Sequence, residues 1–471
     1  MIAGVTASGS ASVERELAAV LGPEAVLPGD ARPYLADATE SRNLWGRADA
    51  VVLPPTAESV AAVLRWCYEH DVAIIARGGG TGFAGGAVPL DGGVVVSLER
   101  LRAVRQLDPG LWRMSVEAGV TTADLRRRAR ESGLLFPPDP GAAEQSQIGG
   151  NIATNAGGPH AFKYGVTGAW VSGLEVVLAP GELVAIGGPL RKDVAGYDLR
   201  SLLVGSEGTL GIVTAAWLKL IPAPETSLPA VAFYAGAADG CAALEAVLAN
   251  GLVPAALEYL DEGALEAARG AFPAAVPADA RFMLIADADG TSEEGARVRS
   301  ELVEVLGEGA ESVHAPTEAR EIAQLWRWRE GASLAVTAQR GGKVSEDIVV
   351  PVDRLREAID ATVQIGRRHQ LPACSWGHAG DGNLHSTFMI DPGDPQELRR
   401  AEDAAEELFA LAARLGGSVS GEHGLGWVKR GALERQWDPA ALAKHEAVKS
   451  AFDPKGLLNP GKKLARLSEP G

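Results

Sequence analysis

The sequence has few cysteines, and their positions exclude several kinds of site. Cys67, Cys241 and Cys374 are the 3 cysteines among 471 residues, and they lie far apart in the chain. Such spacing provides neither a disulfide framework nor the CxxC pairs that bind zinc or iron–sulfur clusters. We therefore expect buried thiols in a reducing cytoplasm.

A long apolar segment and an excess of positive charge are also missing. No uncharged apolar run is long enough to cross a bilayer, and the first residues lack the basic and apolar regions of a signal peptide. The formal net charge of −17 argues against nucleic acid and anionic membranes as partners. The one basic run, Arg126 to Arg130, has the pattern of a solvated helix face. We expect a cytoplasmic protein that binds no nucleic acid and is not an integral membrane protein.

The chain is long enough to form two or more domains, with 46% hydrophobic residues among its 471. From Ala50 onward, short strand patterns alternate with helix patterns, including a helix that begins with a Thr-x-x-Ser cap at Thr56. The Pro-rich stretch Ile221 to Pro229 is expected to be a linker, and strands alternate with Ala/Glu-rich helices beyond it. These patterns predict an α+β protein.

The predicted division has three parts. Residues 1–222 form a first domain with its N-terminal segment, residues 223–445 form a second domain, and residues 446–471 form a C-terminal segment. The stretch Ala451 to Leu464 has a loop-like composition and is too short to be a domain. We therefore expect it to return and pack on the first domain.

Glycine is concentrated in blocks, and the first half contains Ala76 to Gly86, Ile148 to Gly158 and Gly205 to Gly211. Glycine permits positive φ and close approach to a ligand, and its N–H groups bind phosphate well. The first block is neither a dinucleotide GxGxxG fingerprint nor a Walker loop, and alone it fits a tight turn equally well. The recurrence of such blocks favours a large ligand held by main-chain N–H groups.

Two glycine blocks in the second half contain histidines and a carboxylate. His378 and His385 flank a Gly-Asp-Gly turn, and Glu422 and His423 stand together in a second block. Two imidazoles and a carboxylate form a usual open site for a divalent cation, and His423 suits a general base. A purely structural role is the alternative, but the chain has only 8 histidines, and their concentration here favours a site.

In their order, these motifs resemble a known family of flavoproteins. The stretch from Ala50 to Leu220 looks like the flavin domain of the vanillyl-alcohol-oxidase/PCMH superfamily. The stretches GHAGDGNLH, GEHGLG and FDPKGLLNPGK are similar to the C-terminal half of the FAD-linked D-2-hydroxyacid dehydrogenases. That family includes D-lactate dehydrogenases, D-2-hydroxyglutarate dehydrogenases and the glycolate oxidase catalytic subunit. The resemblance implies a PCMH-type FAD-binding domain followed by an α+β, ferredoxin-like substrate or cap domain.

The resemblance also implies FAD as a cofactor and the residues that bind it. Some members attach FAD covalently through a histidine of the first loop, but this loop has Thr81 and no histidine, so we expect dissociable FAD. Pro138, Asp139 and Thr154 are expected near the isoalloxazine, Glu207 and Ile212 along the adenosine half, and Asn459 beside the flavin. The pyrophosphate is expected against Arg77, Gly78, Gly79, Gly80, Thr81 and Gly82 and against Gly149, Gly150, Gly157 and Gly158.

Carried over to this chain, the resemblance assigns the chemistry to the second domain. His378, His385 and Glu422 become ligands of a divalent metal, with zinc expected and manganese or iron as alternatives. His423 becomes the base, and Asn383 is expected to contact the substrate.

Arg329 matches the family's substrate arginine, and an arginine fork suits a carboxylate, although a solvated helix charge is the alternative. Lys343 lies near the position of a lysine for a second carboxylate, but aligning the SEDIVVP segment places Ser345 there. A small monocarboxylate is therefore expected.

The predicted reaction is oxidation of a D-2-hydroxyacid to the 2-oxoacid, with hydride transfer to flavin N5. D-lactate or glycolate is the expected substrate, and D-2-hydroxyglutarate is the alternative. Since the sequence has no nicotinamide motif and no cysteine cluster, the electrons are expected to pass to an external acceptor: a quinone, a cytochrome, an electron-transfer flavoprotein or oxygen. A homodimer or a place in a larger oxidase complex fits this reaction. An alkylglycerone-phosphate-synthase-like transferase and a non-catalytic flavin-binding subunit are the rival interpretations.

Overall fold

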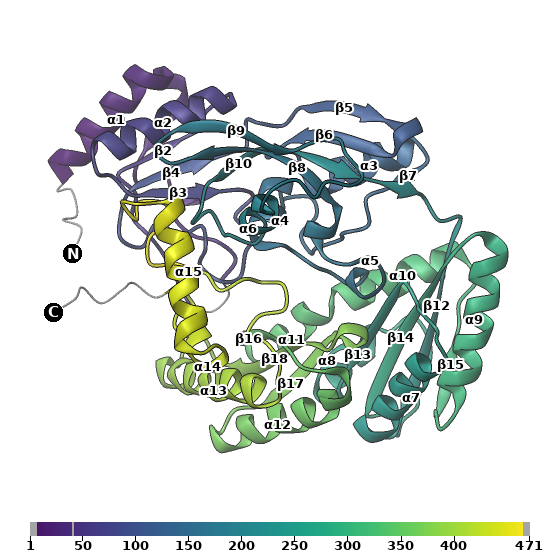
Figure 1. Cartoon of the computed structure of the whole chain (residues 1–471). Helices are drawn as coiled ribbons and strands as arrows, with labels where there is room; N and C mark the ends of the chain where they lie inside the picture. Colours follow the sequence, from purple (N-terminus) through teal and green to yellow (C-terminus); the bar gives the residue numbers. More distant parts are fainter. Residues whose placement is uncertain (1–6, 40–41, 465–471) are drawn as a thin grey trace.

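The computed structural model describes residues 7–39 and 42–464. The predicted first and third segments extend into residues 1–6 and 465–471, which lie outside the described residues. Figure 1 shows two halves, the first in purple to teal and the second in teal to green, with a C-terminal helix in yellow along one edge. Helices and sheets are mixed in both halves, so the α+β prediction is confirmed.

The first half begins with a small sheet in the strand order β1-β2-β4-β3, in which β2, β4 and β3 are parallel. Helix α2 follows β2, and the Thr56 hydroxyl accepts the Ser59 N–H at 3.2 Å, as the cap pattern predicted. Apolar residues of α1 and α2 pack against this sheet. The bounds are α1 Ala7–Leu21, β1 Val26–Pro28, β2 Ala50–Val52, α2 Ala57–Glu69, β3 Ile74–Arg77 and β4 Val94–Ser97.

A second, antiparallel sheet of the first half has the order β5-β6-β10-β8-β9. The helices α3 and α4 pack on it through buried residues such as Leu125 and Ile152. The bounds are β5 Val104–Asp108, β6 Arg113–Glu117, α3 Thr122–Glu131, β7 Leu134–Leu135, α4 Ile148–Thr154, α5 Ala161–Tyr164, β8 Val171–Leu178, β9 Glu182–Gly187, α6 Leu199–Leu203 and β10 Ile212–Lys219.

The Pro-rich stretch predicted to be a linker contributes to two strands, one in each half. β11 (Ile221–Pro222) pairs with β7, and β12 already begins at Thr226. Pro229 is tolerated within β12 because only one neighbour, β14, pairs there; β15 joins on the other side from Val231. The stretch therefore joins the two halves largely as strand, since proline at an unpaired strand edge is compatible with a sheet.

The second half is built on an antiparallel seven-stranded sheet in the order β15-β12-β14-β13-β17-β18-β16. Apolar residues of α7, α9, α12 and α13 form a core on one face, and those of α8, α10 and α11 pack on part of the other. The strands are β12 Thr226–Tyr234, β13 Ala256–Leu260, β14 Phe282–Gly290, β15 Ser312–His314, β16 Gly342–Val349, β17 Ala373–His378 and β18 Asn383–Ile390. The helices are α7 Ala237–Ala249, α8 Glu262–Ala268, α9 Ser292–Gly307, α10 Ala319–Glu330, α11 Ala332–Arg340, α12 Leu355–Arg368 and α13 Pro395–Arg414.

The chain then runs from the second half back to the first. After α14 (Leu433–Gln436) and α15 (Pro439–Phe452), Leu458 bridges Ile74 of β3, and Asp453 accepts the N–H groups of Leu457 and Leu458 (Figure 1). Within the described part of the chain, no helix is long and apolar enough to cross a membrane.

Candidate active site

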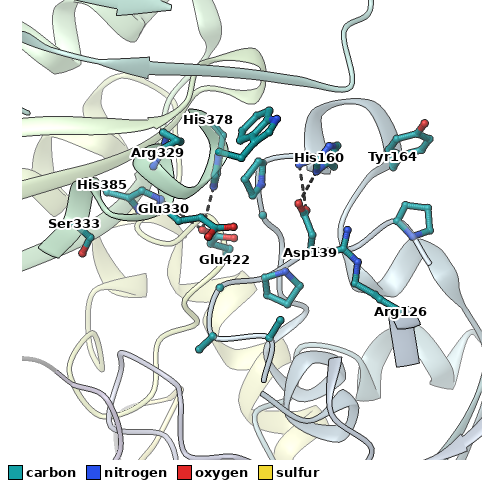
Figure 2. Close-up of a pocket in the computed structure, with 18 of the residues that line it drawn as sticks. Arg126, Asp139, His160, Tyr164, Arg329, Glu330, Ser333, His378, His385 and Glu422 are labelled. Carbon is teal, nitrogen blue, oxygen red and sulfur yellow. Dashed lines mark hydrogen bonds and ion pairs between the residues drawn. The ribbon is translucent and has the colours of Figure 1, made fainter. Parts of the chain in front are cut away.

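Two cavities meet near the contact between the halves. A cavity of about 1220 Å³ lies between residues of both halves, and one of about 190 Å³ lies along the glycine blocks of the first half. Glu422 and His423 line both. In Figure 2, Arg329, His378, His385 and Glu422 lie on one side of the larger cavity. Of the residues that line both cavities, Glu422 and His423 are the ones with ionisable side chains.

The hairpin of β17 and β18 brings His378 and His385 onto one face of the sheet. His378 is opposite Asn383, and His385 is opposite Trp376, so both imidazoles project from alternate positions of the same face. The tight turn requires glycine at Gly382, where φ is +75° and a Cβ would lie 2.0 Å from a backbone oxygen. The hairpin thus brings the two histidines together, which the sequence spacing alone could not show.

The predicted ligand atoms of His378, His385 and Glu422 converge. Glu422 Oε1 lies 3.4 Å from His378 Nε2 and 3.6 Å from His385 Nε2, and the cluster fits within 4.8 Å. Tetrahedral ligands at roughly 2.1 Å from a zinc ion are separated by about 3.4 Å, so these residues fit a divalent cation.

The protonation states of His385 and Glu422 favour the same use, whereas that of His378 opposes it. Burial lowers the pKa of His378, but Glu258 and Glu422 raise it well above its ordinary value, so a metal would have to displace its proton. Burial, with repulsion from His423, lowers the pKa of His385 to about 3, which leaves this imidazole neutral and able to coordinate. Burial raises the pKa of Glu422, but the hydrogen bond to His378 and the charges of the nearby imidazoles outweigh this effect and lower the pKa to about 2. The ready donors are therefore the neutral His385 imidazole and the ionised Glu422 carboxylate, and His378 joins them once a metal displaces its proton.

Glu258 supports the cluster through His378, and the sequence analysis did not find it. Its carboxylate accepts hydrogen bonds from His378 Nδ1 at 2.6 Å and from Arg329 Nη2 at 2.5 Å. Burial raises its pKa, but the charges of His378 and Arg329 lower it more, so the pKa lies below its ordinary value. A carboxylate that orients a ligating histidine is the usual second layer of a metal site. The signal was an acid inside the apolar strand β13.

Arg329 is a buried cavity residue, which rules out a solvated helix charge. Its side chain is 9% exposed, and its Nε has no hydrogen-bond partner among the described residues. One Nη is occupied by Glu258, so the rest of the guanidinium remains for a ligand that accepts hydrogen bonds.

Lys343 and Ser345 also line the cavity. Lys343 is 1% exposed, and its ammonium donates to both the carbonyl and the hydroxyl of Ser333.

His423 lies where the two cavities meet. Its ring stacks on that of His385 at 5.3 Å between centroids and packs against Phe83 at 4.8 Å.

Asn383, predicted to contact the substrate, lines neither cavity. Its amide donates to Asp347 at 2.6 Å and to a backbone carbonyl, so it supports Asp347 beneath the site.

The smaller cavity gathers most of the residues predicted to bind FAD. Its lining includes Arg77, Gly78, Gly79, Gly80, Thr81, Gly82, Gly149, Gly150, Thr154, Glu207 and Ile212. The N–H groups of Gly79 to Gly82 have no hydrogen-bond partner among the described residues, and a Cβ on Gly82 would meet no atom within 4 Å. This loop is therefore an open set of N–H donors that fits a pyrophosphate. The Arg77 guanidinium instead donates hydrogen bonds to the carbonyls of Ala36 and Pro33.

The remaining predicted residues of the FAD site lie around this cradle. Asp139 and Gly158 line the larger cavity, whereas Pro138, Gly157 and Asn459 line neither. Gly157 lies against Glu422, whose Oε2 is 2.8 Å from the Cβ that another residue would have. Asn459 donates its amide to the carbonyls of Gly86 and Glu207 and so supports the cradle from behind.

A second group of charged residues faces the cluster across the larger cavity (Figure 2). His160 Nδ1 contacts Asp139 at 2.5 Å, and its Nε2 lies 3.9 Å from Asp287 of β14. Burial lowers the pKa of His160, but Asp139 and Asp287 more than offset this and raise it to about 10. A protonated His160 thus links the two halves, and no sequence spacing indicated it.

Comparisons with known proteins bear on the identity of this site. Residues 48–187 match a model of an FAD binding domain, and residues 223–463 match a model described as "FAD linked oxidases, C-terminal domain". Glycolate oxidase subunit GlcD of Bacillus subtilis is 37% identical, over 96% of this chain and 97% of that protein. D-lactate dehydrogenase of Anaerostipes hadrus is 34% identical, over 94% and 95%.

Among solved structures, p-cresol methylhydroxylase with substrate bound has a TM-score of 0.82 at 19% identity, over 99% of each chain. That likeness shows a shared fold. The comparisons confirm FAD as cofactor and an oxidoreductase that acts on 2-hydroxyacids. The chain belongs to the FAD-linked D-2-hydroxyacid dehydrogenase family.

Proposed function

We propose that this protein oxidises glycolate or D-lactate to the 2-oxoacid with the help of a divalent metal, and passes the electrons to an external acceptor. One observation carries the proposal: the ligand cluster of His378, His385 and Glu422 lies against His423, where the larger cavity meets the FAD cradle. When bound, FAD supplies the two-electron acceptor, dissociable because no histidine is present in the first loop.

His378, His385 and Glu422 would hold the metal, which we take to be zinc, with manganese or iron as alternatives. A divalent cation there would polarise the substrate hydroxyl and lower its pKa. Glu258 keeps the His378 Nδ1 proton fixed, which leaves Nε2 directed at the cluster.

Arg329 and His423 would act on the substrate directly. The Arg329 guanidinium, oriented by Glu258, has a buried Nε to donate to the substrate carboxylate. His423 would accept the hydroxyl proton as the C2–H bond breaks and the hydride leaves for the cofactor. Holding both groups around one small substrate supplies much of the rate.

The state of Lys343 supports a small monocarboxylate over D-2-hydroxyglutarate. Its ammonium is engaged by Ser333 and lies 5.2 Å from the centre of the Trp376 ring. A second substrate carboxylate would have to displace these contacts.

Three further predictions remain part of the proposal. The protein passes electrons to a quinone, cytochrome, electron-transfer flavoprotein or oxygen, and the name of the Bacillus subtilis relative, a subunit, supports a place in a larger oxidase. We keep the division at residues 222/223 and 445/446. The buried, free thiols of Cys67, Cys241 and Cys374 agree with a cytoplasmic location.

An anaerobic screen tests the proposal. Purified protein reconstituted with FAD is mixed with glycolate, with D- and L-lactate and with D-2-hydroxyglutarate, and the visible flavin absorbance is followed. We expect rapid bleaching by glycolate or D-lactate, and little by L-lactate. If none of these acids bleaches the flavin, the proposal is wrong. Faster bleaching by D-2-hydroxyglutarate would reassign the substrate.

A further inference from the structure

The loop of residues 420–426, here called the His423 loop, is held at its first half by a buried carboxylate of the same domain. Asp347 Oδ2 accepts the N–H groups of Gly421, Glu422 and His423 at 2.8, 2.9 and 3.0 Å and the Ser420 hydroxyl at 2.8 Å. Four donors on one oxygen fix this part of the loop relative to β16.

The second half of the His423 loop is held by a carboxylate from the other half of the molecule. Glu207 Oε1 accepts the Leu425 N–H at 3.0 Å, and Oε2 accepts the Gly426 N–H at 2.7 Å. Lys463 Nζ approaches Oε1 at 3.2 Å from the C-terminal segment. The Glu207 side chain is 5% exposed, so these bonds are shielded from water.

Glu207 adopts a backbone conformation that its residue type disfavours. Its φ is +55°, a region that glycine and asparagine enter much more readily. On the facing loop, Gly424 has φ +78°, and a Cβ there would lie 3.0 Å from the Glu207 carboxyl. The contact therefore depends on the unfavourable backbone conformation of Glu207 and on the absence of a side chain at Gly424. Such strain is retained where the surrounding structure needs that particular side chain.

We propose that Glu207 is a positioning residue for His423. By accepting the N–H groups of Leu425 and Gly426, shortly after His423, it sets the imidazole between the cavities, and it does so only when the two halves are docked. The role of His423 as base is taken from the proposed function. Glu207 also lines the FAD cradle, so the competing interpretation is a contact with the adenosine half of the cofactor.

Glu207→Gln separates the two interpretations. Glutamine keeps the volume, but its NH₂ group would face one of the two N–H donors, so only one loop bond survives. We expect the rate constant for flavin reduction at saturating substrate to fall by roughly tenfold or more, with KM and the FAD dissociation constant changed by less than about threefold. In the His423→Ala background, Glu207→Gln should add less than about threefold, because the group that it positions is gone.

Lys463→Gln is the matched control. It removes the outer partner of Glu207 and leaves both loop bonds, so reduction should stay within about threefold of wild type. Thermal transitions of all variants verify folding.

Hydrogen exchange of peptide 420–427 gives a readout that does not depend on activity. Exchange should be faster in Glu207→Gln than in wild type and unchanged in Lys463→Gln. Unchanged exchange together with weakened FAD binding would overturn the proposal in favour of a cofactor contact. Full additivity with His423→Ala would also overturn it. If no hydroxyacid reduces the wild-type flavin, the proposed function fails, and the exchange result still decides whether Glu207 holds the loop.

Discussion

Glu258→Gln perturbs the layer beneath the ligand cluster without changing a ligand. The Glu258 carboxylate is fully buried and bonds both His378 and Arg329, so one oxygen serves the cluster and the other serves the substrate-binding arginine. Its pKa lies below the ordinary value because, against the effect of burial, the two positive neighbours stabilise the ionised form. Glutamine has one acceptor and no charge, so it satisfies one partner and leaves the other with an NH₂ group facing it.

The structure sets the size of the expected effect. Removing one member of a buried ion pair leaves a buried charge and costs about 3–5 kcal/mol. Because glutamine keeps one hydrogen bond, we expect a loss near the lower end, about 3 kcal/mol. Loss of the carboxylate behind a ligating histidine lowers metal affinity by about 10–100-fold.

The assays are the metal content after dialysis against a weak chelator, the thermal transition, and the KM for the hydroxyacid. Glu258→Gln should lose metal at lower chelator concentration, unfold at lower temperature and show a raised KM. Glu330→Gln is the control, because Glu330 is an exposed acid that lines the same cavity. If Glu258→Gln retains metal and KM like this control, Glu258 neither orients His378 nor positions Arg329.

Three further predictions follow from the site. His423→Ala should bind FAD and metal like wild type but reduce the flavin at least about 100-fold more slowly, as measured by anaerobic stopped flow; a near-normal rate would exclude it as the base. Arg329→Lys should raise KM by about tenfold or more because lysine has no fork, and an unchanged KM would remove Arg329 from carboxylate binding. For His160, burial lowers the pKa, but Asp139 and Asp287 raise it from an ordinary 6.5 to about 10, so its stabilising charge is complete below pH 6.5 and lost towards pH 10. The urea midpoint of wild type should therefore exceed that of His160→Gln, and this difference should be largest near pH 6.5. A difference that grows towards pH 10 would contradict the prediction.

Local patterns predicted the elements and the chemistry-bearing blocks. The Thr56 cap and the Gly-Asp-Gly turn between His378 and His385 both depend on neighbours in sequence, where turn chemistry acts directly. The grouping of His378, His385 and Glu422 was expected from residue type and glycine context, and the structure brings their ligand atoms together.

The supporting residues could not be found in the same way. Glu258 and Asp347 meet their partners only after strands from distant parts of the chain pair, and their acidic character is unremarkable in sequence. The resemblance placed Arg77 against the pyrophosphate, yet its guanidinium donates to two carbonyls some forty residues earlier. Proline in Ile221–Pro229 suggested a break, although an unpaired strand edge accommodates it. Tertiary pairing decides each of these cases.

The most direct test of the account is the metal dependence of flavin reduction in a single preparation. FAD-loaded protein is reduced anaerobically with glycolate and with D-lactate before chelation, after chelation and after zinc is added back, and the rate of flavin bleaching is recorded. The account predicts that metal removal slows reduction by about 100-fold or more while FAD stays bound, and that zinc restores the rate. Metal-free protein that reduces its flavin at the original rate would contradict a metal site at His378, His385 and Glu422 as part of the reaction.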